Sequence, residues 1–206
     1  MTAKNGPDRY RLIQRRLACV NERFEVFFDT IEQPDGSTIG DFLVVQPRVR
    51  HADEIAGICV LPEVGGRIGL MSGYRHHVGT EVWQAPAGFV EAGETPEETA
   101  LRELREEAAL TCKPGDLIPL GTFLPDAGLI AARVALFLAQ DAKPVGAGAM
   151  RCPEVGSGEL IFFGEEELTE LIATSGKVGG STLVACFRYL LLLEENERRA
   201  RSREQR

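Results

Sequence analysis

Apolar and polar positions in the first half of the chain follow the short period expected of β-strands. We predict four strands, at Phe24–Ile31, Ile39–Gln46, Ile55–Leu61 and Ile68–Tyr74. The first two are joined through Pro34-Asp35-Gly36, where proline has a fixed φ and glycine tolerates a positive φ. The second two are joined through Gly65-Gly66. The pattern therefore predicts two consecutive β-hairpins.

A helical period replaces this pattern between Pro96 and about Ala109. Thr95 has a side chain that can cap the helix, and Pro96 suits the first helical position. The apolar residues of this segment recur three or four positions apart and are Ala100, Leu101, Leu104 and Ala108. They predict one buried helical face.

The remaining pattern predicts shorter elements around a long glycine-rich loop. We expect strands near Leu120–Phe123, Ala132–Ala139 and Leu160–Phe163, a loop at Lys143–Gly158, and helices at Glu165–Ala173 and Ser181–Glu195. A mixed sheet between helices is the simplest packing of this order, so the fold class is α/β or α+β. We divide the chain into an N-terminal hairpin region (1–50), a main domain (51–195) and a charged tail (196–206).

Composition narrows the class of protein. The 206 residues include 23 Lys plus Arg against 31 Asp plus Glu, a net charge of −8, which argues against a nucleic-acid-binding protein. No apolar run approaches the length of a membrane span, and the N-terminus lacks the apolar stretch of a secretory signal. The five cysteines are scattered without a CxxC pair, as in reduced cytoplasmic proteins, and we expect Cys59 and Cys186 in the core.

Candidate chemistry is concentrated in one acidic segment, GFVEAGETPEETALRELREEAAL, at Gly88–Leu110. It holds seven glutamates and two arginines. Glu103, Glu106 and Glu107 are spaced so that they project from one helical face. Clustered carboxylates suit Mg²⁺ or Mn²⁺, although three glutamates at this spacing are in most proteins a solvated acidic face.

The whole segment resembles the Nudix box, G-x5-E-x7-R-E-U-x-E-E-x-G-U, where U is a bulky aliphatic residue. The positions in register are Gly88, Glu94, Arg102, Glu103, Leu104, Glu106, Glu107 and Leu110. One position departs, because Ala109 stands where the family has glycine. That glycine resembles a helix-terminal residue with a positive φ, so we expect alanine to cost about 1 kcal/mol there.

The resemblance implies an α/β/α sandwich that hydrolyses a nucleoside diphosphate linked to another moiety. It further implies that Glu103 and Glu107 ligate Mg²⁺ (or Mn²⁺), with Glu106 as a further ligand or a nearby catalytic acid. The main-chain carbonyl of Ala87 is a possible additional ligand. Glu94 and Arg102 would form an ion pair that anchors the loop to the helix. Metal ions of this kind neutralise the pyrophosphate and lower the pKa of an attacking water.

Weaker similarity extends to the ADP-ribose pyrophosphatases and covers about residues 24–193. Tyr74-Arg75 followed by Trp83-Gln84-Ala85-Pro86-Ala87-Gly88 is similar to the approach to the box in that subfamily, although Gln84 replaces its usual glutamate. Pro125 lies near the subfamily's marker proline. We therefore take Arg75, Trp83 and Pro125 as candidate substrate-binding residues; Arg75 could clamp a phosphate or be an ordinary surface arginine.

The catalytic base is left open between two residues. Related pyrophosphatases draw a glutamate from a loop after the box, and Glu154 and Glu159 both lie in the stretch PEVGSGEL. Either could swing in when such a loop closes, and either could be a surface glutamate.

The preferred function is hydrolysis of ADP-ribose to AMP and ribose 5-phosphate. Alternative substrates are GDP-mannose, NADH or another nucleotide sugar, and a nucleotide-sensing module without catalysis is the alternative of a different class. A sensor would be expected to lack box glutamates, and all of them are present. We also expect a homodimer: the N-terminal hairpins have unpaired edges, and in the resembling subfamily this region is exchanged between subunits at the substrate site.

Overall fold

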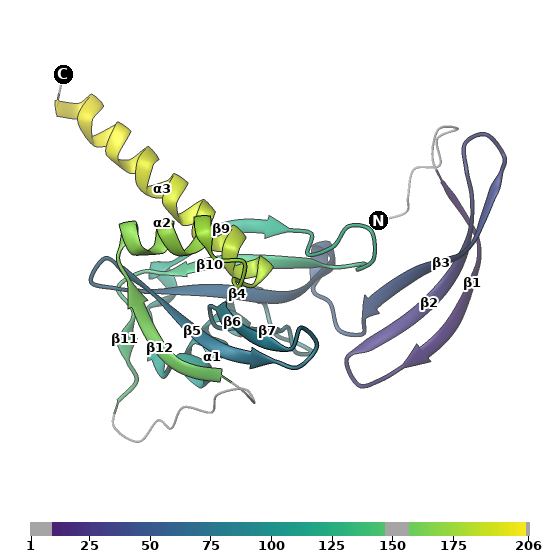
Figure 1. Ribbon diagram of the computed structural model, residues 1–206, viewed down its shortest axis with the longest axis horizontal. Coiled ribbons are helices and arrows are strands. Elements are labelled where there is room, and N and C mark those ends of the chain that lie inside the picture. The colour runs from purple at the N-terminus through teal and green to yellow at the C-terminus, as the bar shows by residue number, and fades with distance from the viewer. Residues whose placement is uncertain (1–9, 147–156, 205–206) are drawn as a thin grey trace.

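The computed structural model describes residues 10–146 and 157–204 and has a mixed sheet as its centre (Figure 1). The strands of this sheet are β4 (Ile55–Val64), β5 (Arg67–Arg75), β6 (Thr80–Gln84), β7 (Ala87–Phe89), β9 (Leu117–Phe123), β10 (Arg133–Ala139) and β12 (Ser157–Phe163). The main strand order is β12-β5-β4-β10-β9, with β6 paired to β5 and β7 to β4. The β4 and β10 strands run parallel, whereas the other pairs are antiparallel.

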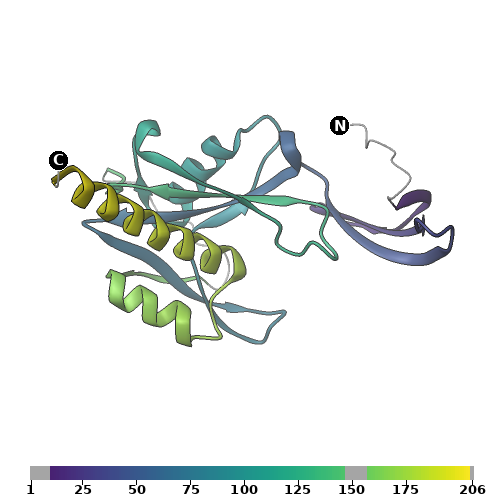
Figure 2. The same cartoon turned by 90° about the horizontal axis from the view of Figure 1, so that it is seen from above.

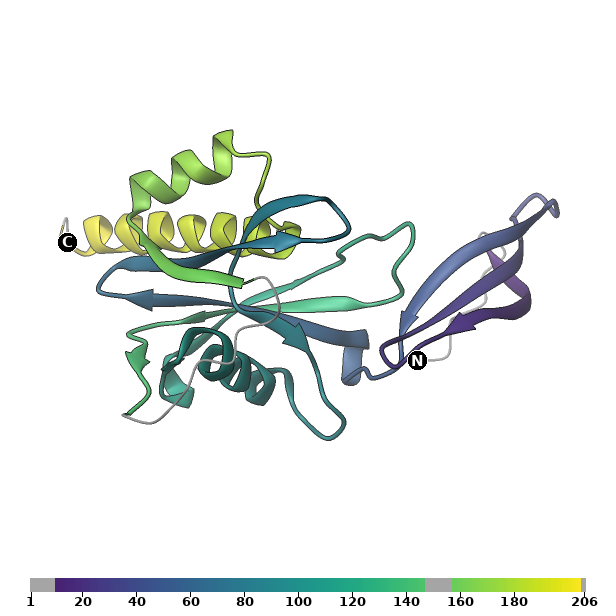
Figure 3. The same cartoon turned by 60° about the horizontal axis from the view of Figure 1, so that its bottom comes forward.

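Helices cover both faces of this sheet. The helices are α1 (Pro96–Ala108), α2 (Glu165–Thr174) and α3 (Gly180–Glu204), and the short elements are η1 (Ala52–Glu54), β8 (Leu110–Thr111), η2 (Pro114–Asp116) and β11 (Lys143–Pro144). Figure 3 shows α1 on one face and both α2 and α3 on the other. The predicted α/β class and the α/β/α sandwich are thereby confirmed.

The central strands β4 and β10 divide their side chains between two cores. On one face, Ile58 and Val60 of β4 pack with Leu104 of α1. On the other, Cys59 and Leu61 pack against α2 and α3. Because both faces are covered, these strands are apolar throughout. The second predicted hairpin corresponds to β4 and β5, and its apolar sequence reflects this burial.

The N-terminal region forms a separate three-stranded antiparallel sheet of β1 (Arg11–Val20), β2 (Phe24–Glu32) and β3 (Thr38–Pro47). It projects from one end of the main sheet (Figure 2). Backbone hydrogen bonds tie β3 to the body of the protein, from Val45 N to Leu129 O and from Ala131 N to Val45 O, both at 2.9 Å. At the base of β2, the ring of Phe24 contacts that of Phe89 edge to face, with ring centroids 5.5 Å apart.

Two elements of the structure include residues for which the sequence predicted no helix or strand. No strand was predicted at β1, whose Arg-rich sequence RLIQRRLACV is exposed along its whole length. The last helix was predicted to end at Glu195, but α3 continues to Glu204. Ion pairs four residues apart stabilise this polar extension, with Glu194, Glu195 and Glu197 bound to arginines one turn later.

The predicted loop at Lys143–Gly158 is wrong at both ends. Lys143 and Pro144 form β11, which pairs with β8, and β12 already begins at Ser157. Gly158 permits the close approach of β12 to β5, because a Cβ atom there would lie 2.2 Å from the carbonyl oxygen of Ser72. Residues 147–156, including Glu154, lie outside the described part of the chain.

Candidate active site

The acidic segment begins its helix through a capping box. The Thr95 hydroxyl accepts a hydrogen bond from the Glu98 amide at 3.1 Å, and the Glu98 carboxylate accepts one from the Thr95 amide at 2.8 Å. Pro96 follows at the first helical position. These contacts satisfy amides that have no partner within the helix, and they fix where α1 starts.

Glu103 and Glu107 lie one turn apart on the inner face of α1. They are only 9% and 7% exposed. The Glu107 carboxylate accepts a hydrogen bond from the Ala87 amide at 3.0 Å. Glu103 packs over Gly88, where a Cβ atom would lie 1.8 Å from Oε1 of Glu103, so only glycine fits at that position. Two buried carboxylates therefore meet the backbone of β7.

Glu106 lies at the edge of this arrangement. Its side chain is 49% exposed, and its carboxylate is 3.3 Å from Nη1 of Arg102. Within residues 10–146 and 157–204, the side chains do not form a three-residue metal-ligand cluster. The donor set of Glu103, Glu107 and nearby backbone carbonyls still fits Mg²⁺, since this cation retains several waters and needs few protein ligands.

Glu94 and Arg102 form the ion pair that the box resemblance implied. Nε of Arg102 lies 2.9 Å from Oε1 of Glu94, and Nη2 lies 3.1 Å from Oε2. The same guanidinium donates to Glu103 at 2.7 Å and to the Phe89 carbonyl at 3.2 Å. Hydrogen bonding by Arg102, opposed by partial burial and aided by Thr99, lowers the pKa of the Glu94 carboxyl. Arg102 therefore connects the loop, β7 and the buried carboxylate.

The helix ends at Ala109, which has φ 54° and ψ 33°. This left-handed conformation is strained for alanine and free for glycine. We expect Ala109→Gly to raise the free energy of unfolding by about 1 kcal/mol, measured by denaturant unfolding. Ala108→Gly, one position earlier inside the helix, is the matched control and should lower it by about the same amount. Equal or lower stability of Ala109→Gly would contradict the assigned strain.

The candidate substrate-binding residues occupy different places. Arg75 lies with Glu107, Ala87 and Ser181 around one small cavity. Pro125 lines a second cavity of about 400 Å³ that also borders Ala87. The Trp83 ring instead packs edge to face on Phe163 at 5.2 Å, and it lines neither cavity.

Sequence reasoning missed the aromatic side chains of the second cavity. Phe89 follows Gly88 directly in β7, and Phe123 comes from β9. Both lie with Pro125 on the wall of the cavity. No spacing in the sequence links Phe89 to Phe123, because only the sheet brings their strands to the same place. The cavity has room and apolar surface for a flat ring, and it shares Ala87 and Ser181 with the small cavity that Glu107 lines.

The structure describes one of the two candidate catalytic bases. Glu159 is exposed and lies in β12, which pairs with β5, one residue past the predicted loop at Lys143–Gly158. Glu154 lies outside the described residues.

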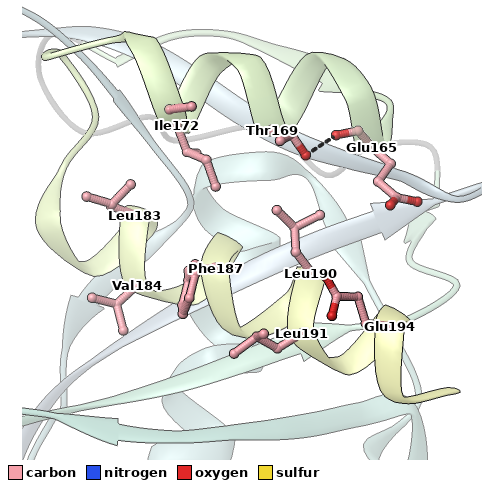
Figure 4. Close-up of a pocket in the computed structure, with 10 residues that line it drawn as sticks. Glu165, Thr169, Ile172, Leu183, Val184, Phe187, Leu190, Leu191 and Glu194 are labelled. Carbon is pink, nitrogen blue, oxygen red and sulfur yellow. Dashed lines mark hydrogen bonds between the residues drawn. The ribbon is translucent and has the colours of Figure 1, made fainter. Parts of the chain in front are cut away.

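A larger groove of about 750 Å³ runs between α2 and α3. Figure 4 shows that the lining side chains come from both helices, with Glu165 on α2 and Glu194 on α3 among the labelled residues. The residues around it include none of the box carboxylates. The candidate active site is therefore assigned from the box carboxylates and not from cavity size.

Two of the cysteines, Cys59 and Cys186, are poor nucleophiles because they are buried. Cys59 and Cys186 have no exposed surface, which confirms their predicted place in the core. Burial raises the pKa of each thiol to about 12, so both stay protonated at neutral pH. No helix in the described part of the chain has the length and apolar composition needed to span a membrane.

Comparison with known proteins agrees with this geometry. Residues 53–147 match the NUDIX domain family. The chain is 30% identical over 156 residues to a CMP-5'-(N-acetyl-N-hydroxy-3-aminopropyl)phosphonate hydrolase of Streptomyces rubellomurinus, covering 75% of this chain and 69% of the relative. It is 31% identical over 117 residues to an ADP-ribose pyrophosphatase of Bacillus subtilis, covering 57% and 58%.

A solved structure described as an ADP compounds hydrolase superposes with a TM-score of 0.76 at 16% identity, covering 93% of this chain and 98% of that one. At this identity the likeness concerns the fold. The box residues, the domain match and the sequence relatives together carry the assignment. The chain belongs to the Nudix family of pyrophosphohydrolases.

Proposed function

We propose that the protein hydrolyses the pyrophosphate bond of ADP-ribose, giving AMP and ribose 5-phosphate, with Mg²⁺ (or Mn²⁺) as the required cation. The observation that carries this proposal is the pair of buried carboxylates, Glu103 and Glu107, with the Arg75 guanidinium on the same cavity as Glu107. A phosphate group that binds between the Arg75 guanidinium and a divalent cation held by the two carboxylates has positive charge on both sides.

In this proposal Glu103, Glu107 and the Ala87 carbonyl hold the metal. When bound, the cation offsets the phosphate charge and lowers the pKa of a water. Arg75 orients a non-bridging phosphate oxygen. Arg102 holds the Glu103 carboxylate in position through their hydrogen bond. Phe89, Phe123 and Pro125 offer an apolar wall for the base or sugar.

A glutamate outside the carboxylate pair is proposed to accept the proton of the attacking water. The candidates are Glu154 and Glu159, with Glu106 as a further acid. We expect alanine at the true base to lower kcat by about 10²-fold or more with an unchanged melting temperature. Single alanine variants at Glu154 and Glu159 should be compared by kcat and by thermal melting. If both retain full kcat, the base lies elsewhere.

A second candidate substrate class comes from the Streptomyces relative, whose name specifies a CMP-linked phosphonate. Its nucleoside and its second phosphorus group differ from those of ADP-ribose, and the same carboxylates could act on both. GDP-mannose, NADH and other nucleotide sugars remain in the same class of nucleoside diphosphates. A nucleotide sensor without catalysis is disfavoured, because every box glutamate is present.

A substrate panel tests this proposal. ADP-ribose, NADH, GDP-mannose and CMP-linked compounds are each incubated with Mg²⁺, and the products are identified by chromatography. We expect the highest kcat/KM for ADP-ribose, with AMP among the products. A higher kcat/KM for a cytidine compound would transfer the proposal to that class, and an absence of hydrolysis across the panel would refute it.

The protein is proposed to act as a cytoplasmic homodimer through its N-terminal sheet. Several large apolar side chains of this sheet are exposed in a single chain, namely Leu12, Ile13, Leu17, Val20, Ile39, Phe42 and Leu43. A sheet with this much exposed apolar side-chain surface needs a partner surface. The second predicted hairpin does not, because β4 and β5 are largely buried within their own chain.

Light scattering at micromolar concentration should give twice the chain mass of 22.5 kDa. Leu17→Asp on β1 should shift the protein to the monomer mass, since a buried unpaired charge disrupts an interface. Val78→Asp, at an exposed valine in the turn after β5, is the control and should leave the mass unchanged. A monomeric wild-type protein would refute dimerisation. Deleting residues 1–50 tests the site: an unchanged KM for ADP-ribose would show that the sheet does not contribute.

A further inference from the structure

Strand β9 contains a bulge close to the point where it reaches the second cavity. Consecutive residues of β10 pair with Gly121 and Pro119, which makes Leu120 an extra residue in β9. Gly121 has φ 87°, a backbone conformation that favours glycine. The regular alternation of side chains between the two faces of the sheet is therefore interrupted at this point of β9.

The bulge determines the face on which the Phe123 ring lies. Ile118 and Phe123 are five residues apart, and an odd separation places side chains on opposite faces of a regular strand. In the structure both pack against the same core, on the face that α2 and α3 cover. Phe123 also lines the second cavity, together with Val134, its cross-strand neighbour on β10. An aromatic ring borders this cavity because the bulge reverses the alternation.

Arg188 of α3 holds the bulge from both sides. Its Nη1 donates to the Leu120 carbonyl at 2.7 Å, and its Nη2 donates to the Thr122 carbonyl at 3.0 Å. The guanidinium lies across Gly121, where a Cβ atom would be 2.8 Å from Nη1. Hydrogen bonds from a charged donor are stronger than those between neutral groups, so the two bonds fix the backbone of β9 on either side of Gly121.

Helix α3 thus contributes to the second cavity in two ways. Gly180 and Ser181, in its first turn, line the cavity directly. Arg188 lies about two turns further along the same helix and acts through β9, which carries Phe123 to the cavity wall. The first turn of α3 and the aromatic wall are therefore held in a fixed relation by one helix.

We propose that Arg188 is a positioning residue, which holds the β9 bulge so that Phe123 can stack on the base of a nucleotide in the second cavity. The inference rests on the proposed function in one respect only, that a nucleoside diphosphate binds beside the box carboxylates. The base is the part of such a ligand that gains from a flat aromatic wall. Arg188 lines neither this cavity nor the small one at Glu107, so its removal raises KM more than it lowers kcat.

The test compares two ligands that carry the same non-hydrolysable diphosphate. Adenosine 5'-(α,β-methylene)diphosphate has a base, whereas methylenediphosphonate has none, and each is titrated into the protein by calorimetry with Mg²⁺. Arg188→Met removes both donors and keeps an aliphatic chain. We expect it to weaken binding of the adenosine analogue by about tenfold and to leave binding of methylenediphosphonate within about twofold of wild type. Arg199→Met, at an exposed arginine of the same helix that pairs with Glu195, is the matched control and should bind both like wild type.

A double-mutant cycle shows whether Arg188 acts through Phe123. Phe123→Ala should also weaken binding of the adenosine analogue by about tenfold. Arg188→Met/Phe123→Ala should then bind it within about twofold of Phe123→Ala alone. Arg188→Lys keeps a charged donor for one of the two carbonyls and should recover part of the lost affinity, and it replaces Arg188→Met in the cycle if that variant does not fold.

Three results would overturn the proposal: an equal loss of affinity for both ligands, a double variant that binds clearly more weakly than Phe123→Ala, or wild-type affinity in Arg188→Met. A wild-type protein that does not bind the adenosine analogue would overturn it as well. If wild type binds this analogue but does not hydrolyse ADP-ribose, the proposed reaction fails while the cycle still decides the role of Arg188.

Discussion

Replacing Glu107 with glutamine is expected to lower kcat by about 10²–10³-fold while the protein stays folded. Glu107 is 7% exposed and lies beside Glu103 on the inner face of α1. Glutamine has nearly the same shape and can still accept the hydrogen bond from the Ala87 amide, so packing is preserved. It lacks the negative charge that would bind a divalent cation.

Stability and metal dependence provide the checks. Removing one charge from a crowded carboxylate pair should leave the free energy of unfolding unchanged or raise it by a few tenths of a kcal/mol. Glu97→Gln, at an exposed position on the same helix, is the matched control and should retain full kcat. Near wild-type turnover in Glu107→Gln, or undiminished wild-type activity in excess EDTA, would contradict the metal assignment.

Replacing Arg102 with methionine should lower the free energy of unfolding by about 3 kcal/mol. The side chains of Arg102 and Glu94 are only 19% and 24% exposed, so the loss leaves a partly buried carboxylate without its cation. Glu103 loses its 2.7 Å contact to the same guanidinium, and the Phe89 carbonyl loses a donor. Methionine preserves much of the aliphatic volume, which separates the loss of charge from the loss of packing.

The pH dependence of this difference follows from the lowered pKa of Glu94. A carboxyl with a lowered folded-state pKa stabilises the protein fully above its unfolded value of about 4.3 and loses that contribution as the pH falls further. The gap between wild type and Arg102→Met should therefore narrow below this pH in urea unfolding. Arg105→Met, at an exposed arginine one turn away from the pair, is the control, with an expected change within about 0.5 kcal/mol. A similar loss in both variants would contradict the anchoring role.

The sequence alone predicted the elements whose formation depends on residues that are close together in the chain. Helix α1 followed from Thr95, Pro96 and the apolar stripe, and the β2–β3 hairpin followed from its turn residues. Strand β1 gave no such signal, because its apolar residues face no core within the chain and its arginines interrupt the alternation. The extension of α3 depends on Glu–Arg pairs that resemble a solvated tail when read as composition.

The candidate site also contains residues that the sequence could group and residues that it could not. Glu103, Glu107, Glu94 and Arg102 lie within one continuous segment, so a motif sufficed to group them. The sheet brings Phe89 and Phe123 to one cavity and Arg75 to Gln84, and spacing along the chain does not encode either arrangement. The Trp83 ring packs on Phe163, and its role in substrate binding stays a prediction.

The central claim, that the carboxylates of α1 support metal-dependent cleavage of a pyrophosphate bond, is tested most directly by ³¹P NMR of ADP-ribose with the purified protein. With Mg²⁺, the account predicts that the diphosphate resonances disappear and two phosphomonoester resonances, those of AMP and ribose 5-phosphate, replace them. In excess EDTA the diphosphate should persist. Diphosphate resonances that persist with Mg²⁺, or cleavage that continues in EDTA, would contradict the account.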